Sequence, residues 1–188
     1  MNEDGNKHLT QNIRGHGNYM AGRDLYITTG KLPSLLETII PAIQDQIDNG
    51  VSEEWAIGEP YGIEEKIKYN NLNGYQYLID EYAEYGSAVD QMYDAFDRDN
   101  PGTKNKIFRF IRAIYLRKKS QLGSNSTKEE IMQVIRMNSD KIFEETIEEI
   151  KNLLIKTSLE LEQVEFGAQI IVSHAFINCK ILERPNAD

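Results

Sequence analysis

Histidines and paired polar residues are the groups in this sequence that could carry out catalysis or hold a metal. The three histidines, His8, His16 and His174, lie far apart and have no cysteine or acidic partner at the spacing that metal sites use. His174 follows Ser173, but a catalytic serine needs a sharp turn and an oxyanion hole, whereas this pair falls within a helical pattern. We therefore interpret His174 as a packing or surface residue.

The other candidate motifs also favour structural roles. A phosphate loop would need Gly-Lys-Ser/Thr after the Gly-His-Gly of residues 15–17, and this sequence does not continue in that way. Paired carboxylates such as Glu144-Glu145 lie in a predicted helix, where they more often form a solvated face than a metal site. Cys179 has no sequence neighbour that would activate its thiol, and we place it on a buried helix face. We expect no catalytic residue, no cofactor and no metal, and hence not an enzyme.

A cluster of cations spans residues 104–119 in a chain whose formal net charge is −9. One interpretation is a solvated helix side, with cations favoured near the helix C-terminus by the helix dipole. The other is a contact with an acidic partner or with a nucleic-acid backbone. The residues that would make this contact are Arg109, Arg112, Arg117, Lys118 and Lys119.

Length and composition limit the classes of protein to consider. A chain of 188 residues forms one domain with an appendage or two small domains. Its acidic charge argues against extensive wrapping of nucleic acid. It has a single cysteine, no secretory signal pattern and no apolar stretch near the roughly 20 residues needed to cross a bilayer. We therefore expect a cytoplasmic protein without membrane contact.

The first 30 residues differ in pattern from the rest of the chain. Residues 8–28 lack a helical apolar period and are rich in glycine and asparagine, which favour tight turns. This predicts a short β-type segment, either a hairpin or stacked rungs. Because two isolated strands are marginal in water, we expect the segment to pair with copies of itself. The residues assigned to this self-association are Ile13, Gly15, Asn18, Tyr19, Gly22, Asp24, Leu25 and Ile27.

Apolar residues at spacings of three and four predict helices in most of the remaining chain, so the expected fold is mainly α, a helical bundle. The expected helices cover residues 31–49, 63–69, 75–96, 107–115, 127–154 and 162–182. Gly86 is a candidate interruption, and Ser126 or Thr127 is the expected start of the long helix. The expected organisation is a self-association segment at 1–30, a helix and connector at 31–60, and a helical interaction domain at 61–188.

Several short motifs carry a resemblance to a known family. They are Lys-Tyr-Asn-Asn-Leu at 68–72, Glu-Tyr at 81–82, Met-Tyr at 92–93, Ile-Arg-Ala-Ile-Tyr at 111–115, and the stretches 165–172 and 175–185. Together they resemble the helical C-terminal domain of effector subunits in bacterial ABC-three component conflict systems, which are related to the Lamassu class of anti-phage defence. Residues 12–27 are similar to short N-terminal motifs of bacterial and prophage conflict proteins that mediate assembly.

The resemblance implies partners rather than chemistry. Such systems contain an SMC-like ATPase that senses foreign DNA, a middle component, and an effector whose helical domain docks it to the complex. In this sequence no nuclease or protease domain precedes the helical domain, so the usual effector activity does not carry over. We predict a non-catalytic assembly subunit that docks to the ATPase or to an effector and oligomerises with itself. The alternatives are a nucleic-acid-binding accessory that uses residues 104–119, and a phage-encoded inhibitor that mimics the docking domain.

Overall fold

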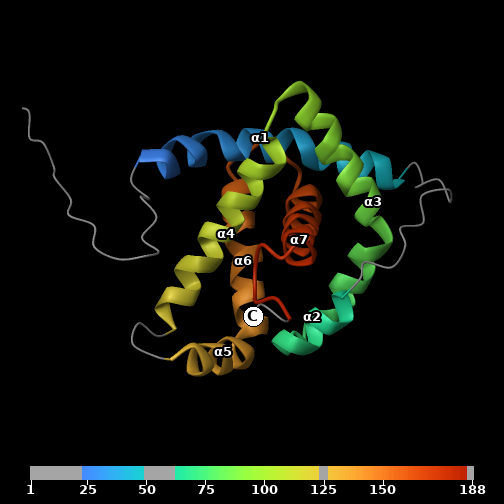
Figure 1. The fold of residues 1–188 in the computed structure, drawn as a ribbon. Helices are drawn as coiled ribbons and strands as arrows, with labels where there is room; N and C mark the ends of the chain where they lie inside the picture. The colour runs from blue at the N-terminus through green and yellow to red at the C-terminus, as the bar shows by residue number, and fades with distance from the viewer. Residues whose placement is uncertain (1–22, 49–61, 123–126, 186–188) are drawn as a thin grey trace, which may run out of the picture.

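A computed structural model describes residues 23–48, 62–122 and 127–185 of the chain (Figure 1). Within these ranges the chain forms seven helices and no strand, which confirms the mainly α fold class. The helices are α1 (Arg23–Asp48), α2 (Ile63–Asn70), α3 (Gln76–Asp99), α4 (Thr103–Gln121), α5 (Lys128–Met137), α6 (Ser139–Leu154) and α7 (Leu161–Ile177). None of the helices in the described ranges is both long and apolar enough to cross a membrane.

The last helix, α7, lies at the centre of the fold. It packs against α1, α3, α4 and α6, and Figure 1 shows these helices around it. Every residue from Ile170 to Phe176 is buried. A helix that is apolar on all sides is stable in water only when other helices cover it, so the sequence of α7 dictates its central position.

Helix α1 belongs to the same hydrophobic core. Leu36, Ile39 and Ile43 are fully or almost fully buried and join the core cluster of the other helices. At Gly167 the side chain of Ile40 in α1 packs so closely against α7 that an added Cβ would lie 2.5 Å from Cδ1 of Ile40. The expected division near residue 60 falls in residues 49–61, which lie outside the described residues, and α1 packs on the helices that follow them.

The β-type prediction for the N-terminal segment is wrong where it can be compared. Residues 23–30, which include Asp24, Leu25 and Ile27, are the first turns of α1. No proline interrupts them, and once a helix is nucleated each further residue adds a backbone hydrogen bond, whereas a lone strand pair is marginal. The other residues assigned to self-association, Ile13, Gly15, Asn18, Tyr19 and Gly22, lie outside the described residues.

The predicted long helix after residue 126 is two helices. Its start is confirmed, because Thr127 and Glu130 form a reciprocal capping box. The chain then breaks at Asn138, whose φ of −121° and ψ of 12° are not helical. Ser139 Oγ donates a hydrogen bond to the carbonyl of Asn71 at 3.0 Å, so a contact with the end of α2 stabilises the break.

Two further expectations about helix boundaries are also wrong. Gly86 does not interrupt α3, which is continuous there. Helix α7 ends at Ile177 rather than near residue 182, because the N–H of Lys180 bonds back to the carbonyl of Ala175 at 2.8 Å, closing the helix. Cys179 then takes a left-handed φ of 55° and is half-buried, so it lies past the helix and not on its buried face.

Candidate interaction surface

The cations of residues 104–119 all lie on α4, and the apolar face of that helix determines which way they point. Ile107, Ile111 and Ile114 are almost fully buried and anchor α4 in the core. Gly102 precedes the helix with a left-handed φ of 83°, where glycine meets no steric penalty. The charged residues between the buried ones are therefore held outward on a helix that cannot rotate freely.

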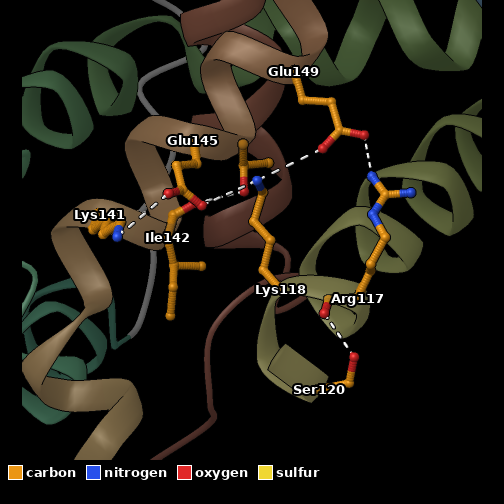
Figure 2. Close-up of polar contacts among 8 residues, drawn as sticks. Arg117, Lys118, Ser120, Lys141, Ile142, Glu145 and Glu149 are labelled. Atoms are coloured by element: carbon orange, nitrogen blue, oxygen red, sulfur yellow. Dashed lines mark hydrogen bonds and ion pairs between the residues drawn. The ribbon is translucent and has the colours of Figure 1, made fainter. Parts of the chain in front are cut away.

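The C-terminal half of α4 is tied to α6 by ion pairs. Arg117 pairs with Glu149, and Lys118 pairs with Glu145 at 3.2 Å and with Glu149 at 3.7 Å. Figure 2 shows the Lys118 ammonium between these two carboxylates, with Lys141 reaching Glu145 from α6 itself. Exposed pairs of this kind add little stability one by one, but the shared carboxylates fix the geometry of the two helices.

The cations at both ends of the cluster also make ion pairs within the chain. Lys104 pairs with Asp90 of α3 at 2.6 Å. Lys119 pairs at 2.5 Å with Glu183, which also accepts a hydrogen bond from Tyr115. Burial alone would raise the pKa of the Glu183 carboxyl, but the bonds from Lys119 and Tyr115 outweigh burial and lower it. These pairs are structural, so most of the cluster serves to hold the chain together.

Three exposed cations of α4 make no ion pair in the described part of the chain. They are Lys106, Arg109 and Arg112, which follow one another at a spacing of three residues. Leu116, which is 39% exposed, lies one turn beyond Arg112. We call these four residues the α4 stripe. Of the five predicted contact residues, Arg109 and Arg112 lie on this stripe, whereas Arg117, Lys118 and Lys119 make the ion pairs described above.

Two of the sequence motifs meet where α2 contacts the C-terminal segment. Asn70 is fully buried, and its side-chain amide donates to the carbonyl of Glu183 at 2.8 Å and accepts from the N–H of Glu183 at 2.9 Å. Lys66, 3% exposed, donates to the carbonyl of Phe176 and lies 4.2 Å from the centre of that ring. Burial lowers the pKa of Lys66 to about 8.

Lys66 is not among the functional residues predicted from the sequence. Its position could have indicated that it is buried, because it lies one turn before Asn70 and next to the buried Ile67 on the same short helix.

His174 is fully buried, which confirms a packing role. Its ring stacks on Tyr93 and Phe108, with ring centres 4.8 and 5.2 Å apart. Burial raises the pKa of Tyr82, so the phenol keeps its proton, and its hydroxyl is hydrogen-bonded to Nδ1 of His174. Asp90 lies 3.6 Å from Nε2.

That carboxylate does not keep the imidazole protonated. Burial, and then the charge of Lys104, lower the pKa of His174 to about 3. Burial is the larger cause, and Lys104, which pairs with Asp90, adds a positive charge that disfavours an imidazolium. His174 is therefore a neutral core residue near pH 7.

Comparison with models of known protein families finds a match that covers most of the chain. A model of C-terminal domain 10 of the ABC-three component systems matches residues 34–183. The chain belongs to this family. The match to C-terminal domain 10 confirms the predicted relationship to ABC-three component systems. It begins within α1 and ends at Glu183, the residue that Asn70 holds. Comparison with curated proteins found no match, and neither did comparison with solved structures.

In this C-terminal domain 10, the exposed and buried polar groups divide by role. Among the buried ones, Lys66, Asn70 and His174 bond to the backbone or stack on rings of the same chain. In the described ranges there is no group of three or more histidine, cysteine and acidic residues that could hold a metal ion. The cations of the α4 stripe are exposed and make no ion pair in the described part of the chain, which makes them a candidate contact surface.

Proposed function

We propose that this chain is a non-catalytic docking and assembly subunit of a bacterial anti-phage system of the ABC-three component, Lamassu-like kind. In this proposal the α4 stripe contacts an acidic surface of another protein component, such as an SMC-like ATPase or an effector. The N-terminal segment joins copies of the chain, and the complex works in the cytoplasm. Membership of the C-terminal domain 10 family supports a role in such a system.

The observation that carries the proposal is the set of exposed cations left over on α4. Lys106, Arg109 and Arg112 lie on one face of a chain whose net charge is −9, and Leu116 adds an apolar group beside them. Arginine beside exposed apolar surface is typical of protein interfaces. Core packing and the ion pairs to α6 hold the helix in place, so binding would cost little ordering of its backbone.

The alternative of a nucleic-acid-binding accessory rests on the same cations, and their number argues against it. Four of the seven, Lys104, Arg117, Lys118 and Lys119, are occupied by ion pairs within the chain. Neutralising phosphates with three cations gives a slope of log affinity on log salt of about −2.7, which is low for a dedicated binder. The overall negative charge weakens such binding further.

Charge reversal tests the proposed contact. The double variant Arg109→Glu, Arg112→Glu should weaken binding to the purified ATPase or effector of the same system by about tenfold or more, measured by titration calorimetry. The matched control, Arg98→Glu with Lys156→Glu, reverses two exposed cations elsewhere and should change the dissociation constant less than about twofold. Equal losses in both variants, or in neither, would contradict a contact through the stripe.

Titration with duplex and single-stranded DNA at low salt distinguishes the alternative. The docking function predicts no binding that depends on Arg109 and Arg112. Binding that weakens steeply with salt and is lost in the double variant would instead favour the nucleic-acid accessory.

Self-association is tested separately by light scattering. Removal of residues 1–22 leaves α1 intact and should lower the oligomeric mass without reducing helical content. An unchanged mass would refute the assembly role of the N-terminal segment.

A further inference from the structure

A pocket open to solvent lies between α3 and α7, on different residues from the α4 stripe. Leu78 and Tyr82 of α3 and Phe166 and Ile170 of α7 supply its apolar lining. Phe166 is half-buried, whereas the other three are almost fully buried, so the phenyl ring forms an accessible edge. Figure 1 shows α3 beside the central helix α7.

The pocket contains an unsatisfied hydroxyl. Ser173 is fully buried and lines the pocket, and its Oγ has no hydrogen-bond partner among the described residues. A serine inside a helix often bonds to the carbonyl four residues before it, and Ser173 does not. The other hydroxyl of the lining, on Tyr82, is already bonded to His174. Because buried polar groups in native proteins nearly always have a partner, the Ser173 hydroxyl is available to bond to a polar group that enters the pocket.

The rim of the pocket is acidic. Glu81 is an exposed residue of the lining, and Glu162 is exposed one turn before Phe166 on the same face of α7. In the described part of the chain neither carboxylate makes an ion pair. Gln169, a half-buried residue of the lining, adds a neutral amide. An apolar lining with acidic edges is the complement of a helix with one apolar and one basic face.

We propose that the α3–α7 pocket is the centre of a docking groove for a basic amphipathic helix of a partner protein. The apolar face of that helix covers Phe166 and Leu78, its lysines or arginines face Glu81 and Glu162, and one polar side chain bonds to Ser173. The groove gives the docking subunit a second face of opposite charge to the α4 stripe, so the two faces accept different partners or different parts of one partner.

A synthetic peptide of about four helical turns tests the groove directly. It carries leucines and one glutamine on one face and lysines on the other, and its comparison peptide carries glutamates in place of the lysines. By fluorescence anisotropy the basic peptide should bind at least about tenfold more tightly than the acidic one. Absence of binding by the basic peptide at millimolar concentration would overturn the proposal.

Variants then separate the groove from general attraction to an acidic protein. Glu81→Lys should weaken binding about fivefold or more, whereas Glu129→Lys, an exposed acidic residue of α5, should change it less than about twofold. Equal effects of the two variants would overturn the proposal. The Arg109→Glu, Arg112→Glu variant should bind the basic peptide at least as tightly as the unaltered chain, so failure of the α4 contact and failure of the groove are distinguishable.

Ser173→Ala provides the test that does not depend on fold integrity. Removing an unsatisfied buried hydroxyl should leave the melting temperature unchanged or higher. Binding of the glutamine-bearing peptide should weaken about three- to tenfold, whereas an all-leucine version of the peptide should be unaffected. Equal affinity of the glutamine peptide for both proteins would show that Ser173 plays no part in recognition and would overturn that contact.

Discussion

Acidification should destabilise this fold through His174 in particular. The imidazole is fully buried between Tyr93 and Phe108, and its pKa is lowered to about 3, mainly by burial. In the unfolded chain the same group has an ordinary pKa near 6.5. As the pH falls through this interval the unfolded chain takes up a proton that the folded chain does not, so unfolding becomes more favourable. The stability is fully present at neutral pH and is lost progressively from about pH 6.5 to about pH 3.

The size of the effect follows from the two pKa values. One pKa unit corresponds to about 1.4 kcal/mol, and integration from pH 7 to about pH 4.5 gives a loss of about 2–3 kcal/mol from this one group. Urea denaturation at a series of pH values measures it. Carboxylates also titrate in this range, so the informative quantity is the difference between the unaltered chain and a variant without the histidine.

His174→Gln is that variant, because a glutamine amide can replace the hydrogen bond with Tyr82 but does not titrate. Its free energy of unfolding should fall between pH 7 and about pH 4.5 by about 2–3 kcal/mol less than that of the unaltered chain. The variant's absolute stability is not the test, since repacking alone changes it. Equal pH dependence of the two proteins would refute the argument that His174 is held neutral in the core.

Three further perturbations test other contacts. Gly167→Ala should destabilise the fold by about 1–3 kcal/mol in urea denaturation, because its Cβ would lie 2.5 Å from Ile40. Asn70→Ala should cost about 2–4 kcal/mol, because it leaves the N–H and carbonyl of Glu183 without their partner. Stability should rise from about pH 8 towards about pH 10, since the lowered pKa of Lys66 lets the folded chain lose its proton first, and Lys66→Met should abolish this rise.

Controls exist for these changes. Asn73→Ala removes an exposed amide that bonds only to the Asn71 side chain in the described part of the chain, and should have an effect below about 0.5 kcal/mol. A loss as large as that of Asn70→Ala would contradict the assigned role of Asn70. For Gly167, a variant as stable as the unaltered chain would show that α1 moves away from α7 at little cost.

Helices that bury one clear row of apolar residues can be predicted from the sequence. The apolar spacing in residues 107–115 and the Thr127–Glu130 capping box are local signals, and both hold in the structure. The break at Asn138 is not local, because its stabilising bond runs from Ser139 to Asn71, far away in sequence. The end of α7 at Ile177 also cannot be predicted from the apolar pattern. Ile181 and Leu182 are buried, as that pattern would require of a longer helix, but they belong to an irregular segment.

The candidate site shows the same limit. Arg117, Lys118 and Lys119 are indistinguishable from Arg109 and Arg112 in a list of charges, and their acidic partners lie 27 to 64 residues further along the chain. Only the fold brings these carboxylates to α4. Ser173 is likewise an unremarkable helical serine in sequence, and its missing hydrogen bond becomes visible only once α3 and α7 are packed together.

The central claim is that the chain docks to another component of its system through the α4 stripe. Light scattering on the chain mixed with the purified ATPase or effector of that system tests it most directly. Docking through the α4 stripe should give a complex whose mass is the sum of its components. This complex should be absent with Arg109→Glu, Arg112→Glu and retained with Arg98→Glu, Lys156→Glu. Absence of any complex between the unaltered chain and these components would contradict docking. A complex unaffected by charge reversal at Arg109 and Arg112 would contradict docking through the stripe.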